Sequence, residues 1–228
     1  MLWDSDGLNM AVADRAKLTK EQIAAAGALH WTLVQWQVTD NALSRLREAM
    51  PGFGPEEALL KVVAINALYG TNVFALVRAA RHVHQVLASV ELSNAGPALV
   101  ESLANIPTTS GAKPRRYVSF ASKLAHFFVS PEHFPIYDSY AERMLQFHLG
   151  PAAVRDPARP YEAFMANLER LKLECGLNCS YRELDRYLWI AGLYRAHERG
   201  ERKLNAEVLH LFDHPSAGQR ALLSTLRG

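Results

Sequence analysis

The sequence predicts an all-α protein, and three observations lead to that fold class. Apolar residues recur at three- and four-residue spacing in successive segments, which is the period of an amphipathic helix. Prolines and capping residues stand where these segments begin, and the connections between them are rich in Gly, Pro and Ser. No run of alternating apolar and polar residues indicates a β-strand. The pattern predicts roughly nine or ten helices.

Local signals predict where several helices begin and end. Thr19 followed by Gln22 is typical of a capping box that opens a helix over 21–37. Pro55 is predicted to be the first residue of a helix that ends at Tyr69, with Gly70 as its C-cap. Helical spacing also predicts helices in the segments 71–87, 115–128, 160–174, 180–201 and 204–212.

The domain organisation is predicted to be simple. Residues 1–17 resemble a poorly anchored arm, and 18–228 are predicted to form a single helical domain of two lobes. The central lobe covers about 55–150, and the second lobe combines about 18–54 with about 151–228. A cleft between two lobes is where we expect a ligand.

Composition excludes several classes of protein. The 228 residues are 49% hydrophobic and 21% charged with a net charge of +2, which is typical of a soluble globular chain. No apolar run is long enough for a membrane span, and the first residues lack the pattern of a secretory signal, so we expect a cytoplasmic protein. Cys175 and Cys179 are too few for a structural zinc site or an iron–sulfur cluster. We expect two reduced thiols, no metal and no cofactor.

The segment after Pro114 is predicted to be a helix with two different faces. If the helix begins at Pro114, one apolar face packs against the core. The opposite stripe, at spacing i, i+3, i+4 and i+7, contains Ser119, Ser122, Lys123 and His126. Two serines beside a lysine leave room for another molecule to approach the amine. A solubilising surface lysine remains the alternative for Lys123.

The charges around this helix favour an anion site. From Ser102 to Pro131 there is no Asp or Glu, whereas Lys113, Arg115 and Arg116 stand near the predicted helix start. Free backbone N–H groups and the helix dipole at an N-terminus add to this positive potential. A nucleic-acid phosphate is the ligand that such a cluster would position without reading its sequence.

Asp138 is predicted to be an N-cap. It follows Pro135 and immediately precedes the helix-like run SYAERML, so its carboxylate can accept backbone N–H bonds. A capping role alone would stabilise the helix by about 1 kcal/mol. A carboxylate fixed and kept ionised in this way could also stabilise developing positive charge.

The order of these segments resembles the helix-hairpin-helix DNA glycosylase superfamily, in its 8-oxoguanine DNA glycosylase-like branch. NIPTTSGAKPRRYVSFASK resembles the family's hairpin and lysine helix, with Gly111 as its single hairpin glycine, and FPIYDSYAERML resembles the aspartate and its helix. EEALLKVVAINALYGTNVFALVRAARHV and YRELDRYLWIAGLY are similar to the opening and closing helices of the family's central domain. The resemblance spans roughly 55–195.

The resemblance implies a two-lobed helical bundle of the helix-hairpin-helix DNA glycosylase type and a base-excision reaction. Lys123 would be the nucleophile at C1′, Asp138 the activating carboxylate, and a Schiff base would permit AP lyase cleavage. The residues implied to bind DNA are Lys113, Arg115, Arg116, Ser119 and Gly111. The residues implied to line the base pocket are Asn66, Tyr69, Ser122 and His126.

Partner and substrate follow from the same resemblance. The partner would be double-stranded DNA containing a modified base, bound by a monomer that flips the base from the duplex. An oxidised purine such as 8-oxoguanine, or a bulky modified pyrimidine of phage DNA in an anti-phage defence role, would be the substrate. The alternative is a helical DNA-binding or damage-sensing module without chemistry.

Further residues are assigned structural roles. His82 and His84 are two apart on a predicted helix and face different directions, so they do not form a metal pair. Tyr187 and Trp189 are predicted to be core, with base stacking as the alternative for an aromatic near the cleft. Arg182, Asp185 and Arg186 have the spacing of a solvent-facing ion-pair cluster on one helix.

Overall fold

The computed structural model describes residues 17–108 and 115–227, and within them every regular element is a helix. This part of the chain contains eleven α-helices and two short 3-10 helices, in agreement with the predicted all-α class. The α-helices are α2 (Lys20–His30), α3 (Val34–Ala49), α4 (Pro55–Tyr69), α5 (Leu76–Ala88), α6 (Ala98–Ala104), α7 (Val118–Phe128), α8 (Ser139–Leu149), α9 (Pro160–Cys175), α10 (Tyr181–Glu198), α11 (Ala206–Asp213) and α12 (Ala217–Arg227). The 3-10 turns are η1 (Leu92–Asn94) and η2 (Gly150–Ala152).

Several predicted helix ends are confirmed. The side chains of Thr19 and Gln22 form a capping box at the start of α2. Pro55 is the first residue of α4, and Gly70 ends it with φ of 57°, in the left-handed region that favours glycine. These ends were predictable because each depends on residues within one helical turn.

Other predicted boundaries are wrong. The helix predicted over 21–37 is broken at residues 31–33 into α2 and α3, and the Thr32 hydroxyl bonds to the carbonyl of Leu29 at the break (2.8 Å). The helix predicted over 71–87 begins only at Leu76. The lysine helix α7 begins at Val118 instead of Pro114. Pro114 and residues 1–16 of the predicted arm 1–17 lie outside the described residues. Tertiary contacts, which local signals do not report, fix these starts.

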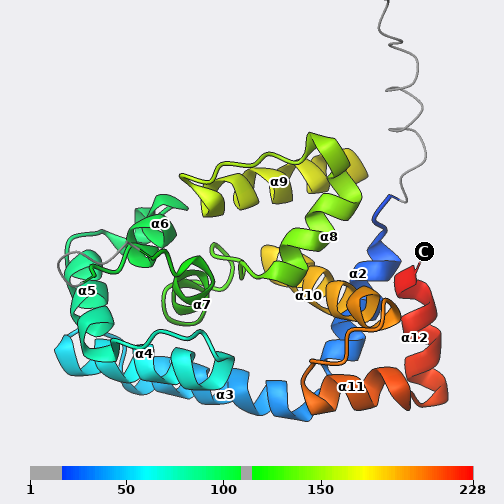
Figure 1. Cartoon of the computed structure of the whole chain (residues 1–228), viewed down its shortest axis with the longest axis horizontal. Helices are drawn as coiled ribbons and strands as arrows, with labels where there is room; N and C mark the ends of the chain where they lie inside the picture. Colours follow the sequence, from blue (N-terminus) through cyan, green and yellow to red (C-terminus); the bar gives the residue numbers. More distant parts are fainter. Residues whose placement is uncertain (1–16, 109–114, 228) are drawn as a thin grey trace, which may run out of the picture.

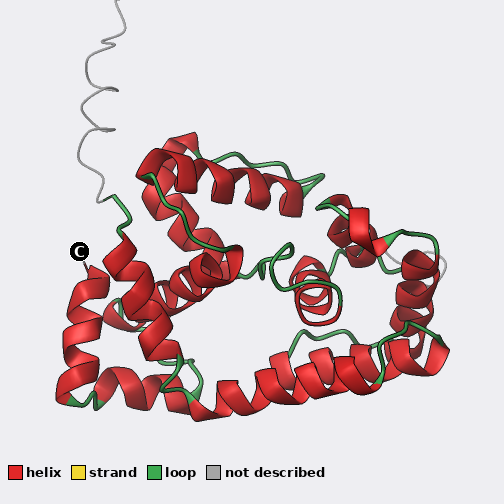
Figure 2. Cartoon of the chain, turned by 180° about the vertical axis from the view of Figure 1, so that it is seen from behind, coloured by secondary structure: helices red, strands yellow, loops and turns green. Residues whose placement is uncertain are grey.

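Helix α7 lies in the middle of the molecule. Figure 1 shows it nearly end-on, with α3 and α4 on one side and α6 on another, and Figure 2 shows the same arrangement from behind. Helices α3, α4, α6 and α9 all contact it. Both the apolar face and most of the predicted polar stripe of α7 are therefore buried, including Ser122, Lys123 and His126.

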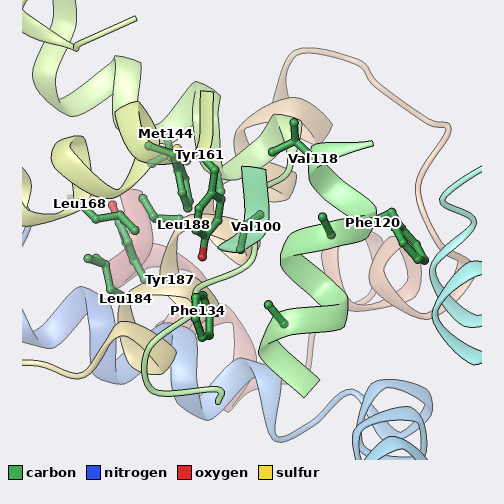
Figure 3. Packing of buried hydrophobic residues seen from close by; sticks show 14 of the residues in the cluster. Val100, Val118, Phe120, Phe134, Met144, Tyr161, Leu168, Leu184, Tyr187 and Leu188 are labelled. Atoms are coloured by element: carbon green, nitrogen blue, oxygen red, sulfur yellow. The ribbon is translucent and has the colours of Figure 1, made fainter. Parts of the chain in front are cut away.

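The remaining helices pack against one another beside α7. Helix α10 packs against α2 and α8, α8 packs against α9, and α12 packs on α2 so that the two ends of the described chain meet. The Gln22 side chain donates to the carbonyl of Leu226 across that contact (3.4 Å). Figure 3 shows Tyr161 of α9 between Phe134 and the apolar side chains of α8 and α10 in the core.

The contact between α8 and α10 leaves no room for a side chain at Gly192. A Cβ atom there would lie 2.8 Å from the carbonyl oxygen of Tyr140, and backbone cannot move aside cheaply.

We predict that Gly192→Ala lowers the free energy of unfolding by about 1–3 kcal/mol. The control is Gly27→Ala in α2, where no heavy atom lies within 4 Å. That substitution should stabilise by roughly 0.5–1 kcal/mol through helix propensity. Urea unfolding measures both, and equal effects of the two substitutions would contradict the close approach.

Candidate functional site

A cavity opens between α7, α10 and the turn before α8, and it contains about 570 Å³ of space not filled by atoms, including its mouth. Helices α2, α3, α4, α7 and α10 and the segment before α8 supply the wall. The lining residues are His30, Trp36, Asp40, Tyr69, Lys123, His126, Phe127, Ile136, Asp138, Arg182, Asp185, Arg186 and Trp189.

Lys123 presents a buried amine to this cavity. The side chain is 7% exposed, and its Nζ donates to the hydroxyl of Ser119 one turn earlier (2.7 Å). The amine also lies 5.6 Å from the centre of the Tyr69 ring. Burial lowers the pKa of Lys123 below the ordinary lysine value, while the negative charges of Asp138 and Asp185 oppose that shift. A larger fraction of this amine is therefore neutral than of an exposed lysine.

Asp138 lies on the wall of the same cavity and is the N-cap of α8, as predicted. Its Oδ1 accepts the backbone N–H groups of Tyr140 and Ala141, each at 2.8 Å. These two bonds hold the carboxylate in one orientation, and the helix N-terminus stabilises its negative charge. The fold therefore brings the predicted amine and carboxylate to one cavity.

The segment of residues 134–137 is held in place by side chains from three helices. His126 of α7 bonds through Nδ1 to the carbonyl of Phe134 (2.9 Å), and the hydroxyl of Ser122 accepts the N–H of Tyr137 (3.0 Å). The hydroxyl of Tyr161 on α9 donates to the carbonyl of Pro135 (2.8 Å). The carboxyl of Asp185 on α10 accepts the N–H of Ile136 (3.2 Å). The position of Asp138 is therefore fixed from both sides of the cavity.

Aromatic rings form a large part of the wall. Trp36 stands edge-on to Trp189 (4.8 Å between ring centres), and Tyr69 is tilted against both Trp36 (5.6 Å) and Phe127 (5.5 Å). Such rings offer flat apolar surface to a planar ligand. Trp189 was predicted to be core or a stacking residue, and it lies at the cavity, whereas Tyr187 is buried and bonds to His148.

The polar stripe of α10 was misassigned from the sequence. Arg182, Asp185 and Arg186 were predicted to be a solvated ion-pair cluster, but all three line the cavity and Asp185 is 8% exposed. Burial raises the pKa of Asp185 well above the ordinary aspartate value, and the nearby charge of Asp138 adds to the shift. Trp189 continues the stripe at i+7 from Arg182, and an aromatic residue at that position was the available signal that the stripe is not solvated.

Helices α2 and α3 contribute residues that sequence reasoning missed. His30 and Trp36 lie on either side of the break between these helices, and Asp40 accepts a bond from the Tyr69 hydroxyl (3.4 Å). Burial raises the pKa of Asp40. These residues are far from α7 and α10 in the sequence, and no local motif marks them.

Two of the predicted pocket residues have structural roles instead. Asn66 does not line the cavity, because its side-chain oxygen accepts bonds from the Thr71 hydroxyl (2.9 Å) and the Val73 N–H (2.8 Å) and so organises the turn after α4. Ser122 is fully buried behind the wall, where it bonds to Tyr137. The other two predicted pocket residues, Tyr69 and His126, do line the cavity.

The predicted DNA-binding cluster is only partly available. Arg116 forms a partly buried ion pair with Glu101 of α6 and donates to the carbonyls of Pro157 and Ala158 ahead of α9, so it ties elements of the fold together. Arg115 is exposed beside the ring of Tyr117, and Ser119 is engaged by Lys123. Gly111 and Lys113 lie outside the described residues.

The described residues contain no group of three or more His, Cys, Asp or Glu side chains that could hold a metal ion. His82 and His84 each bond to a different backbone carbonyl, those of Ser102 and Phe53. Cys175 and Cys179 are free thiols, as predicted. In the same part of the chain no helix is both long and apolar enough to cross a bilayer.

Two cavity histidines are neutral near physiological pH. Burial lowers the pKa of both His30 and His126 to about 4, and the charges of Arg182 and Arg186 act in the same direction. His126 can bond to the Phe134 carbonyl only as a donor, so Nδ1 carries its proton and Nε2 carries a lone pair.

These histidines predict a pH dependence of stability. Their folded pKa lies below the unfolded value of about 6.5. The unfolded chain therefore binds more protons between pH 6.5 and 4, and the free energy of unfolding falls as pH falls through this window. We predict that His126→Gln, which keeps an N–H donor for Phe134, reduces the slope of the free energy of unfolding against pH. The reduction should correspond to the uptake of about one proton fewer on unfolding. Urea unfolding at several pH values measures it, and an unchanged slope would contradict the buried neutral imidazole.

Comparisons with known proteins match part of the chain to a family model and to one curated protein. The family model HI_0787_N, described as an N-terminal domain, matches residues 19–133, which is half of the chain. A curated protein of Haemophilus influenzae with the printed name "Uncharacterized protein" is 31% identical over 135 residues, which are 56% of this chain. The match spans only 62% of that relative's length. No solved structure is significantly similar to this chain.

Proposed function

The chain belongs to the HI_0787_N family, and we propose that it is a DNA glycosylase that excises a modified base by cleaving the N-glycosidic bond. The observation that carries the proposal is the placement of the Lys123 amine and the Asp138 carboxylate on the wall of one cavity. The amine has a lowered pKa through burial, and the carboxylate is fixed by two backbone N–H groups. A nucleophile and a rigid anion facing one cavity are the groups that this reaction requires.

Asp138 would stabilise the sugar as the bond breaks. Departure of the base gives C1′ the character of an oxocarbenium ion, as in glycoside hydrolysis. A carboxylate that is already oriented needs no reorganisation when this positive charge develops. The two N–H donors from the first turn of α8 provide that orientation.

Lys123 would be the nucleophile. The lone pair of its neutral amine forms a bond to C1′ while the bond from C1′ to the base breaks. The resulting ammonium group loses a proton, and the sugar ring opens to a Schiff base. Abstraction of a C2′ proton then allows the 3′ phosphate to leave, which is the AP lyase step. Burial supports this role because it raises the neutral fraction of the amine.

The aromatic wall supports the binding of a flipped base. Trp36, Tyr69 and Trp189 would contact the faces and edges of a planar ring inside the cavity. Flipping costs a few kcal/mol, and damaged or mispaired bases cost least. The substrate class is an oxidised purine such as 8-oxoguanine, or a bulky modified pyrimidine of phage DNA in a defence role. The fold would be a bundle of the helix-hairpin-helix glycosylase type, with α6 and α7 flanking the hairpin position.

Duplex DNA would approach along the exposed Arg115, which lies on the connection before α7. This arginine remains available for phosphate because its described neighbour is the ring of Tyr117 and not a carboxylate. Lys113 and Gly111 retain their proposed role in the same connection. A monomer bound to one modified duplex is sufficient for this chemistry.

Borohydride trapping tests the nucleophile. We predict that the protein forms a covalent adduct with a duplex containing an abasic site, because borohydride reduces a Schiff base between Lys123 and C1′. Lys123→Gln should abolish the adduct, since an amide cannot form a Schiff base. Lys203→Gln, which removes an exposed lysine outside the cavity, should leave it unchanged. Denaturing gel electrophoresis and peptide mass spectrometry identify the modified residue.

Asp138→Asn tests the carboxylate without removing the helix cap, because Asn also accepts backbone N–H bonds at an N-cap. We predict a decrease of about 10²-fold or more in base release under single-turnover conditions, with unchanged thermal stability. The panel contains 8-oxoguanine duplexes and phage DNA with glucosylated hydroxymethylcytosine. DNA binding without any released base or adduct would contradict the enzyme and support a non-catalytic DNA-binding module.

A further inference from the structure

The cavity contains a second carboxyl group whose surroundings differ from those of Asp138. Asp185 lies on α10, lines the cavity together with Lys123 and Asp138, and is 8% exposed. Its Oδ1 accepts one backbone N–H, that of Ile136 (3.2 Å). Its Oδ2 has no hydrogen-bond partner among the described residues. One oxygen therefore holds the 134–137 segment, and the other is not used by the fold.

We propose that Asp185 is a catalytic acid of this site, which protonates the departing base through Oδ2 while Oδ1 remains bound to the backbone. The inference rests on the proposed glycosylase function and adds the group that completes the reaction. Lys123 and Asp138 act on the sugar, and neither provides a proton for the departing base. Asp185 lines the same cavity and comes from α10, a different helix from those of Lys123 and Asp138.

The proton balance of bond cleavage requires such a group. When the bond between C1′ and the base nitrogen breaks, its electron pair remains on the base. An anionic base is a poor leaving group, so a proton that arrives as the bond breaks favours its departure. The proton moves from Oδ2 of Asp185 to a ring nitrogen or exocyclic oxygen of the base. C1′ accepts the lone pair of Lys123, and the products are a neutral base, a protonated secondary amine and the Asp185 carboxylate.

The charges around Asp185 allow it to keep a proton. Lys123 and His126 face the cavity from α7, Asp138 from the start of α8, Asp40 from α3, His30 from α2, and Arg182 and Arg186 from α10 itself. Burial raises the pKa of the Asp185 carboxyl, and the Asp138 charge raises it further, whereas Lys123 and Arg186 lower it. Asp138, in contrast, accepts two N–H bonds at a helix N-terminus. Two carboxyl groups in such different surroundings suit an acid and an electrostatic stabiliser.

Asp185→Asn separates the acid from a purely structural role. The amide oxygen of Asn still accepts the N–H of Ile136, but the side chain has no acidic proton. The probes are a duplex with one 8-oxoguanine, phage DNA with glucosylated hydroxymethylcytosine, and the first duplex with an abasic site in place of the base. On the abasic duplex no base departs, so the adduct with Lys123 forms without protonation of a leaving base.

We expect Asp185→Asn to slow base release by roughly 10²–10³-fold. Formation of the borohydride adduct on the abasic duplex should change by no more than about twofold. Asp213→Asn is the matched control, because Asp213 is an exposed carboxylate that pairs with His197 away from the cavity. It should change neither reaction. An equal decrease of both reactions in Asp185→Asn would assign Asp185 a structural role and overturn the proposal, as would undiminished base release.

The pH profile of the wild-type protein is a second measurement, and it does not depend on whether a variant folds. Base release should decrease as pH rises through the pKa of Asp185, since the acid loses its proton, and adduct formation on the abasic duplex should show no such decrease. A base-release rate that keeps rising with pH, parallel to adduct formation, would overturn the proposal. Absence of both base release and adduct in the wild-type protein would instead overturn the glycosylase function itself, and the role of Asp185 with it.

Discussion

The site depends on the way in which four side chains bind the backbone of residues 134–137. Ser122 and His126 from α7, Tyr161 from α9 and Asp185 from α10 all bond to backbone polar groups of this short segment. Backbone groups in a buried segment without a helix or strand must find partners of this kind, or folding loses about 1–3 kcal/mol for each. Because the same contacts end at the N-cap of α8, the bonds that make the fold stable also aim the Asp138 carboxylate at the cavity.

The two buried lysines among the described residues show what distinguishes a structural amine from a reactive one. Lys61 of α4 is fully buried, but its Nζ donates to the carbonyl of Gly52 and lies 4.0 Å from the ring centre of Phe53, outside the cavity. Lys123 faces open space and two carboxyl groups, and its only hydrogen-bond partner among the described residues is a hydroxyl. Burying Lys123 and Asp185 beside the half-buried Asp138 costs desolvation energy, and a cost of this kind is typical of functional sites.

Sequence reasoning reached the parts of this structure that depend on neighbouring residues. The caps at Thr19 and Asp138 and the helix ends at Pro55 and Gly70 follow from contacts within one turn. The polar stripe of α10 was assigned to solvent because charges at i, i+3 and i+4 have the same spacing on a buried face as on an exposed one. Only the packing of α2 and α8 on α10 separates these cases. Asn66 was predicted to line the pocket, but its side chain bonds to Thr71 and Val73 in the turn after α4. Residue spacing does not reveal these partners.

The central claim is that burial in this cavity gives Lys123 an amine of lowered pKa while Asp138 opposes the shift. The most direct test is an NMR titration of lysine labelled with ¹³C at Cε, with the Lys123 signal assigned by its loss in Lys123→Gln. We expect this signal to titrate below those of the exposed lysines, and lower still in Asp138→Asn, where the opposing negative charge is absent. A Lys123 signal that titrates together with the exposed lysines, unaffected by Asp138→Asn, would contradict it.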